Sequence, residues 1–242
     1  MVGDEKNESR SRNLGFGFWD SHCPSSPLLL HCITRMANRT DPFAQTVHGT
    51  NPQYLVEKIT RLKIYNTNYW KETCFGLTAA TVLEKAASLK YCGGLYGGNL
   101  QPSKFLCLLL KLLQLQPEKE IILAYIENED FKYVRALGAF YFRLVGKADE
   151  IFATLEPLYN DFRKLAYRGA SGWSVTHMDE FVDSLLREEL VCDIALPHIV
   201  KRYKLEALGT LDPRRSALED ELEALEELEA RALEGRGEGR DS

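Results

Sequence analysis

Residues 128–144 read NEDFKYVRALGAFYFRL and form the longest helix that the sequence predicts for the body of the chain. Apolar side chains recur there at helical spacing in two neighbouring stripes, and Asp130 is placed to cap the first turn. Gly138 interrupts this pattern, although glycine inside a helix costs about 1 kcal/mol relative to alanine. We therefore predict that Gly138 lies where another helix crosses closely.

The stretches just before this helix also carry helix signals. Residues 105–115 are apolar on almost every side apart from Lys111 and Gln114, and Pro102 is placed to open the helix that contains them. A helix that is apolar all round is buried, so this one should be the centre of the fold. Pro117 opens a further helix that ends before residue 128.

Two earlier helices are marked by their first residues. Asn51 is a suitable cap for a helix with Pro52 at its first position, and Thr78 caps a second helix that Gly93 ends. The spacing places three apolar residues of the first helix on one face, which predicts that they point inward: Leu55, Ile59 and Leu62.

The only strand-like signal lies in residues 164–167 and 173–176, on either side of a turn that contains two glycines. This pattern predicts a short hairpin. Thr176 and Asp179 then form a capping box for the next helix, and two more helices are expected on either side of Pro197.

The last part of the chain is acidic. The net charge of the chain is -5. Residues 217–242 contain ten acidic residues and three arginines, so their net charge is -7 and that of residues 1–216 is +2. Ser216 and Glu219 form a capping box that starts a long acidic helix. An isolated helix of this kind is marginal in water, so its narrow leucine seam should need a partner: Leu218, Leu222 and Leu225.

These signals predict an all-α protein. We expect a single compact multi-helix domain with at most one short β-hairpin, followed by the long acidic C-terminal helix. The expected boundaries are a disordered or unrelated extension over residues 1–35, the helical domain over 36–211, and the acidic helix with a disordered end over 212–242. A nearly neutral body argues against strong sequence-independent binding to nucleic acid.

The glycine cluster in residues 91–99, which read YCGGLYGGN, suggests a phosphate-binding loop but does not fit one. It lacks the Gly-Lys-Ser/Thr ending and follows no strand with G-x-G-x-x-G spacing. A structural turn is favoured, because glycine allows positive φ and close backbone approach. Tyr96 and Asn99, which alternate with the glycines, are candidate surface contacts for a partner.

The sequence predicts no catalytic site, metal site or cofactor. The six cysteines stand singly, without the C-x-x-C spacing of zinc sites. Cys192, Asp193 and either His177 or His198 could be combined into a nucleophilic site, but scattered histidines allow such combinations by chance. The acidic residues 127–130 lack the alternating ligands and the glycine of a calcium loop.

Several short blocks, in one order along the chain, resemble the pre-mRNA-splicing factor 38 family. They start near residue 36, continue to about residue 229, and cover most of the chain. Besides the glycine cluster, the blocks are HGTNPQYL at 48–55, YWK at 69–71, QPEK at 116–119, LEPLYND at 155–161 and CDI at 192–194.

The resemblance implies an all-helical, non-enzymatic scaffold subunit of the spliceosome in the nucleus. Such proteins join with the tri-snRNP or at the precatalytic B-complex stage, and they are needed for activation, when the U4 RNA is released. The resemblance also implies two partners, a microfibrillar-associated protein 1 homologue and a matrin-type zinc-finger protein. Family relatives often carry a longer arginine/serine-rich tail. Two alternatives remain open: a helical domain that contacts spliceosomal RNA directly, and a helical hydrolase.

Overall fold

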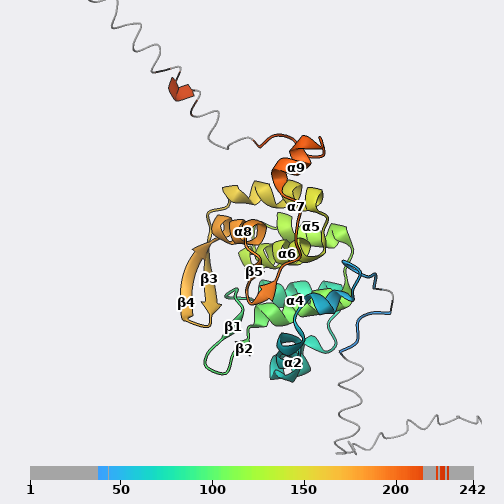
Figure 1. The fold of residues 1–242 in the computed structure, drawn as a ribbon. Coiled ribbons are helices and arrows are strands. Elements are labelled where there is room, and N and C mark those ends of the chain that lie inside the picture. Colours follow the sequence, from blue (N-terminus) through green and yellow to red (C-terminus); the bar gives the residue numbers. More distant parts are fainter. Residues whose placement is uncertain (1–37, 43, 215–221, 223, 227, 229–242) are drawn as a thin grey trace, which may run out of the picture. The chain divides into compact units, whose positions relative to one another are not determined.

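The structure is a computed structural model that describes residues 38–42, 44–214, 222, 224–226 and 228. Five helices form the centre of the described body: α3 (Ala79–Ala87), α4 (Lys104–Leu115), α5 (Lys119–Glu127), α6 (Lys132–Val145) and α8 (Met178–Arg187). Helix α4 packs against α3 and α6, and α6 also contacts α5 and α8 (Figure 1). The predominantly helical fold agrees with the prediction.

Helix α4 is the buried centre that its composition predicts. Residues 105–114 are all buried, and Ser103 caps the helix by accepting a hydrogen bond from the Leu106 backbone N–H at 3.1 Å. The helix therefore begins two residues after Pro102, which lies in a short strand instead. The Lys111 ammonium is satisfied inside the protein by the Phe75 carbonyl and Gln114 Oε1, and burial lowers its pKa.

Helix α6 crosses α5 at Gly138, as predicted. A Cβ atom at Gly138 would lie 2.8 Å from the Tyr125 Cβ, closer than real Cβ atoms pack, and 3.1 Å from the Ile126 Cγ1. The predicted cap was wrong, because Asp130 does not cap this helix. Asn128 Oδ1 accepts a hydrogen bond from the Phe131 backbone N–H instead, and the helix begins at Lys132.

Three phenylalanines join the central helices. Phe105 and Phe140 stack with ring centroids 6.0 Å apart and planes 10° apart. Phe181 from α8 meets both rings edge-on, at 6.5 Å and 6.4 Å. These distances and angles match the favourable offset and T-shaped ring arrangements. We call Phe105, Phe140 and Phe181 the phenylalanine cluster.

The shorter helices surround this centre. They are the 3₁₀ helices η1 (Pro52–Leu55) and η3 (Glu156–Asn160), the π-helical η2 (Tyr69–Cys74), and the α-helices α2 (Lys58–Asn66), α7 (Ala148–Leu155) and α9 (Arg202–Ala207). Asn51 caps η1 as predicted, since its side chain accepts a hydrogen bond from the Gln53 N–H.

The predicted inner face of α2 was wrong. Ile59 is 67% exposed and Leu62 is 51% exposed, whereas Thr60 and Ile64 point inward. The reason is a break in the helix. The chain is extended at Val56 between η1 and α2, so the helical spacing that would join Leu55 to Ile59 is interrupted.

The described residues contain three two-stranded antiparallel sheets, which corrects the prediction of at most one hairpin. They pair β1 (Leu95–Tyr96) with β2 (Gln101–Pro102), β3 (Lys164–Gly169) with β4 (Gly172–His177), and β5 (Leu190–Val191) with β6 (Ile194–Ala195). Only β3 and β4, the predicted hairpin, are long enough to show strand composition. The two-residue ladders depend on turns with positive φ, which a period-two pattern cannot reveal.

Two predicted helix boundaries also change near this hairpin. Strand β4 continues through His177, so α8 begins at Met178, and the capping box joins His177 to Glu180 in place of Thr176 and Asp179. The chain before Pro197 forms β5 and β6, and α9 follows it, so the two helices predicted around Pro197 are one. No helix within the described ranges has the length and apolar character that a membrane crossing requires.

Candidate partner-binding surface

The glycine cluster brings three distant segments of backbone together. Gly93 has φ +143°, and a Cβ there would collide with the backbone of Arg168 in β3. A Cβ on Gly94 would lie 2.8 Å from the carbonyl carbon and oxygen of Cys192. These glycines therefore allow close backbone approach, as the sequence indicates, and any side chain at either position would force the segments apart.

The turn between β5 and β6 holds the glycine cluster in place. Cys192 and Asp193 both have positive φ, 51° and 58°, which is the geometry of a tight hairpin turn. The Asp193 carboxylate accepts a hydrogen bond from the Leu95 backbone N–H at 2.7 Å. Two blocks that lie about a hundred residues apart, and that both carry the family resemblance, thus form one structural unit.

Strand β1 lies beside the long hairpin of β3 and β4 (Figure 1). Four side chains contact one another there. The Arg168 guanidinium carbon lies 3.7 Å from the ring centroid of Tyr96, 4.9 Å from that of Trp173 and 5.7 Å from that of Tyr91. Tyr91 and Trp173 also contact each other edge-on at 5.1 Å. We call these four residues the arginine–aromatic surface. Trp173 is 62% exposed, and the other three are half-buried.

This composition is typical of protein interfaces. Arginine, tyrosine and tryptophan are the residues most enriched at interface hot spots. Tyr96, which the sequence singled out, belongs to the surface. Asn99, the other predicted contact from the cluster, is exposed in the turn between β1 and β2. The role of Tyr96 and Asn99 as partner contacts stays a prediction.

The other three residues of the surface were not predicted as contacts from the sequence: Tyr91, Arg168 and Trp173. A signal for two of them was available in the predicted hairpin. Arg168 pairs with Trp173 directly across the strands, next to the pair Gly169–Gly172 that closes the turn. A two-residue turn at residues 170–171 sets the pairing of the two strands. Directly paired residues lie on the same face of a hairpin, so this turn predicts that the Arg168 and Trp173 side chains are neighbours. The contact with Tyr91 and Tyr96 depends on tertiary packing.

The predicted leucine seam lies partly outside the described residues. Leu218 is one of the residues that the structure does not describe. Leu222 and Leu225 are helical, and their exposed fractions are 55% and 56%. The seam as a partner site therefore stays a prediction.

The residues that could be combined into a nucleophilic site, Cys192, Asp193 and His177 or His198, have structural contacts or are exposed. Burial raises the pKa of the Cys192 thiol well above its ordinary value, which disfavours the reactive thiolate. Asp193 holds the glycine cluster, His177 lies 3.4 Å from the Glu180 carboxylate at a helix cap, and His198 is exposed. Among the described residues, no group of three or more His, Cys, Asp or Glu side chains is arranged to hold a metal ion.

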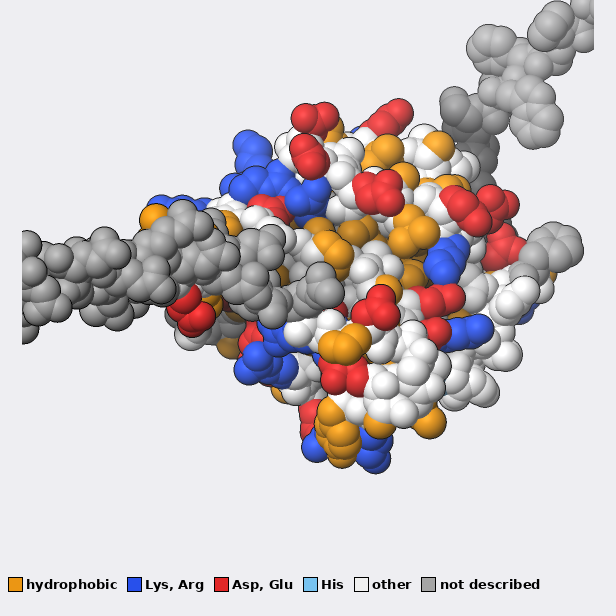
Figure 2. Space-filling model, turned by 90° about the horizontal axis from the view of Figure 1, so that it is seen from above, with side chains coloured by type: hydrophobic (Ala, Val, Ile, Leu, Met, Phe, Trp, Pro, Cys, Tyr) orange, Lys and Arg blue, Asp and Glu red, His pale blue; other side chains and the backbone are white. Residues whose placement is uncertain are grey.

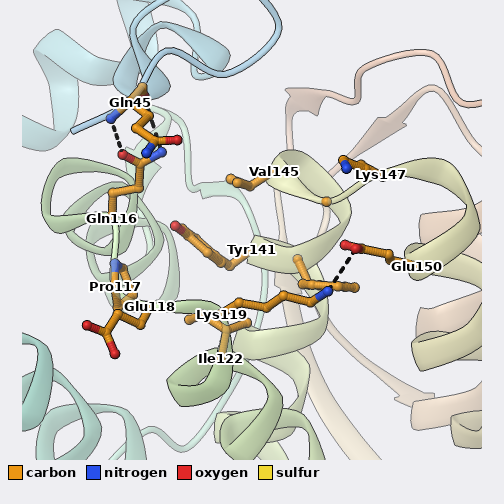
Figure 3. A pocket seen from close by; sticks show the side chains of 12 residues that line it. Gln45, Gln116, Pro117, Glu118, Lys119, Ile122, Tyr141, Val145, Lys147 and Glu150 are labelled. Atoms are coloured by element: carbon orange, nitrogen blue, oxygen red, sulfur yellow. Dashed lines mark hydrogen bonds and ion pairs between the residues drawn. The ribbon is translucent and has the colours of Figure 1, made fainter.

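A pocket of about 460 Å³ lies beside Tyr141, and Figure 3 shows the side chains that line it. The Lys119–Glu150 ion pair, at 2.8 Å, lies on one side of it. On the other side, Gln45 and Gln116 exchange two hydrogen bonds between backbone and side chain. Burial raises the pKa of the Tyr141 phenol, so this hydroxyl stays protonated and offers no base.

A wider hollow of about 1170 Å³ is lined by the Asp161 carboxylate, which binds two arginines. Burial alone would raise the pKa of Asp161, but hydrogen bonds from Arg163 and Arg135 lower it to about 2. A carboxylate that stays ionised at neutral pH between two arginines stabilises the fold and is poorly suited to act as a general acid or base.

The charges on the visible face also bear on function. Figure 2 shows acidic and basic side chains interspersed with apolar ones, so no single sign of charge covers that face. This distribution does not favour sequence-independent nucleic-acid binding there, because such binding depends on clustered cations.

Comparison with known proteins identifies the family. The model of the PRP38 family matches residues 45–209. Pre-mRNA-splicing factor 38A of Xenopus tropicalis is 58% identical over 195 residues, which cover 80% of this chain and 62% of that protein. The human protein of the same name is 57% identical over 192 residues and is also covered to 62%. The chain thus spans less than two thirds of these relatives.

A solved structure has a similar fold. It is the crystal structure of the Snu23-Prp38-MFAP1(217-258) complex of Chaetomium thermophilum, and the matching chain is 41% identical. The TM-score is 0.72, and the match covers 78% of this chain and all of that chain.

Proposed function

The chain belongs to the PRP38 family, and from that premise we propose that it is a non-enzymatic scaffold subunit of the spliceosome that acts in the nucleus through protein–protein contacts. The observation that carries this proposal is the solved relative, which was crystallised together with Snu23 and a segment of MFAP1. Since the whole of that relative's chain matches this one, we propose that homologues of both proteins are partners here: the microfibrillar-associated protein 1 homologue and the matrin-type zinc-finger protein.

A reconstitution experiment tests the partners. The purified full chain would be mixed with a fragment of the MFAP1 homologue equivalent to residues 217–258 and, separately, with the zinc-finger protein. Co-elution in size-exclusion chromatography is expected for each. If neither the fragment of the MFAP1 homologue nor the zinc-finger protein binds at tens of micromolar, the scaffold proposal for this chain fails.

The stage of action is a second, finer proposal. We expect the chain to be required when the precatalytic B complex is activated and the U4 RNA leaves. Splicing extract depleted of the protein should accumulate B-stage complexes that retain U4, and added full chain should restore release. Normal U4 release in the depleted extract would contradict this role.

We further propose that the acidic C-terminal seam takes part in partner binding. Leu222 and Leu225 are exposed, and an amphipathic helix gains by laying its apolar side on another helix or groove. Changing Leu218, Leu222 and Leu225 together to serine should weaken co-elution with a partner. The melting of the body should stay nearly unchanged.

The matched control for the seam is Leu208→Ser, which alters a leucine that is 74% exposed elsewhere on the chain. It should bind like the wild type. If the triple variant also binds like the wild type, the interface lies wholly on the body.

A further inference from the structure

The Arg168 guanidinium lies among aromatic rings, and none of the described acidic residues forms an ion pair with it. Three rings surround it, and the closest is the ring of Tyr96 at 3.7 Å. Within the described residues, no hydrogen bond or ion pair is found for its side chain. Several other arginines of the body bind carboxylates: Arg135 and Arg163 bind Asp161, and Arg202 binds Glu156. Arg61 and Arg143 instead donate hydrogen bonds to backbone carbonyls, those of Val56 and Leu185.

This arrangement leaves the guanidinium ready to bind an anion. A guanidinium carries five N–H donors in its own plane, and stacking on a ring occupies its face without using those donors. The surrounding rings restrict the side chain to few conformations, so little conformational entropy is lost when an anion binds. A carboxylate can accept two parallel hydrogen bonds from such a fork.

The neighbouring strand β4 has an open edge. On the other side of the hairpin, the Cys92 N–H donates to the Ala166 carbonyl and the Arg168 N–H donates to the Cys92 carbonyl. Ala166 and Arg168 thus point their peptide groups away from β4. In an antiparallel pair, residues directly opposite each other both point their peptide groups either toward the partner strand or away from it. Val175 is opposite Ala166 and Trp173 is opposite Arg168, so the N–H and C=O groups of Val175 and Trp173 point away from β3, toward the open edge of β4. Within the described part of the chain, no strand pairs with that edge.

The same two residues expose apolar side chains on one face. Trp173 and Val175 are two residues apart in β4, and their exposed fractions are 62% and 68%. An exposed strand edge with apolar side chains and a neighbouring cation matches the features by which proteins bind extended peptides.

We propose that the arginine–aromatic surface binds an extended acidic segment of a protein partner, with a carboxylate on the Arg168 guanidinium and an apolar side chain on Trp173 and Val175 at the open edge of β4. The proposal rests on the scaffold function above and specifies one of its contact sites.

The geometry favours a peptide over single-stranded RNA. Stacking of bases requires open ring faces. Here the guanidinium covers the Tyr96 ring, and Tyr91 and Trp173 meet edge-on, with planes 78° apart. The open peptide groups of β4 and the aliphatic side chain of Val175 offer partners to a polypeptide.

A random twelve-residue peptide library, displayed on phage and selected against the full chain, tests the proposal. Counter-selection against Arg168→Gln would remove peptides that bind elsewhere. We expect the remaining peptides to be enriched in Asp or Glu beside an apolar residue. A selection without acidic enrichment, or one that yields no peptide specific to Arg168, would overturn the proposal.

The strongest selected peptide would then be synthesised with a fluorescent label, and its affinity measured by anisotropy. Arg168→Lys keeps the charge but removes the planar fork, so Kd should rise about tenfold or more. Replacing the acidic residue of the peptide by its amide should weaken binding similarly and add little to Arg168→Lys. Simple additivity of the two changes would contradict a direct contact.

Arg61→Gln is the matched control, because Arg61 also stacks on a ring, that of Tyr54 at 4.3 Å, but lies outside the surface. It should leave the peptide affinity unchanged. The affinity of a labelled, uridine-rich RNA of twelve nucleotides would be measured in the same way and compared with that of the peptide. Tighter binding of RNA than of peptide, lost in Arg168→Gln, would replace the proposal with RNA recognition. Thermal melting of each variant must match the wild type.

The fragment of the MFAP1 homologue separates this inference from the scaffold function. If that fragment binds the wild-type chain while no acidic peptide does, the scaffold role stands and the proposed contact fails. If the fragment does not bind but peptides do, the proposed partner is wrong and the acidic-peptide site stands.

Discussion

The phenylalanine cluster and the arginine–aromatic surface are both built from aromatic side chains that meet edge-on or stacked, yet they differ in burial. Phe105 and Phe140 are fully buried, whereas Trp173 is 62% exposed. The cluster joins three helices of the core. The surface lies where a hairpin meets a loop and centres on a cation. Burial, rather than aromatic content, therefore indicates which group stabilises the fold and which is available to a partner.

The largest expected difference between the two regions is in stability. Phe140→Ala should lower the free energy of unfolding by about 3–5 kcal/mol, because it removes a buried ring and leaves a cavity between helices. Urea denaturation would measure this. Phe162→Ala is the matched control, since that ring is 69% exposed and its loss should cost little. Equal losses would mean that burial does not determine how much an aromatic ring contributes to stability in this fold.

The helix crossing can be tested by adding volume. Gly138→Leu should destabilise the fold by about 1–3 kcal/mol, because even a Cβ there would lie 2.8 Å from the Tyr125 Cβ. Gly98→Leu provides the comparison, since no atom lies within 4 Å of a Cβ at that position. Melting temperatures of both variants suffice. An unchanged value for Gly138→Leu would show that the crossing is looser than the structure indicates.

The pH dependence of stability tests the Asp161 carboxylate and its two arginine partners. The folded pKa of Asp161 is about 2, below the ordinary value, so the ionised carboxylate stabilises the fold above about pH 4. This stabilisation, about 1–2 kcal/mol, is lost as pH falls from about 4 to 2. The stability difference between wild type and Asp161→Asn should therefore shrink over that range. Glu84→Gln, at an exposed position, should show no comparable change.

The smallest stability effect is expected on the surface. Trp173→Ala should cost about 1 kcal/mol or less, because it removes only an edge-on contact and a cation–π contact at an exposed site. Trp70→Ala should cost several times more, since that ring is 4% exposed and donates a hydrogen bond to Asn38. Calorimetry of both variants would decide. A large loss for Trp173→Ala would assign the surface a structural role.

The sequence by itself determined the helical class, the burial of α4, the crossing at Gly138 and the long hairpin. Each of these follows from a local pattern: an all-apolar helix, a glycine inside a strong helix, or two strand segments around a turn. The short blocks that resemble the splicing factor 38 family were likewise recognised from the sequence alone. Tyr96 was identified because it alternates with glycines whose spacing is unusual.

Only the tertiary structure decided the inner face of α2, the two small ladders and the arginine–aromatic surface. The extended residue Val56 interrupts the helical spacing, and turns with positive φ form ladders too short for a pattern. Arg168 and Tyr96 lie far apart in the sequence and meet because Gly93 lets two backbones approach closely. Local spacing fixes which side of one element is apolar, but contacts between distant elements depend on how the chain packs.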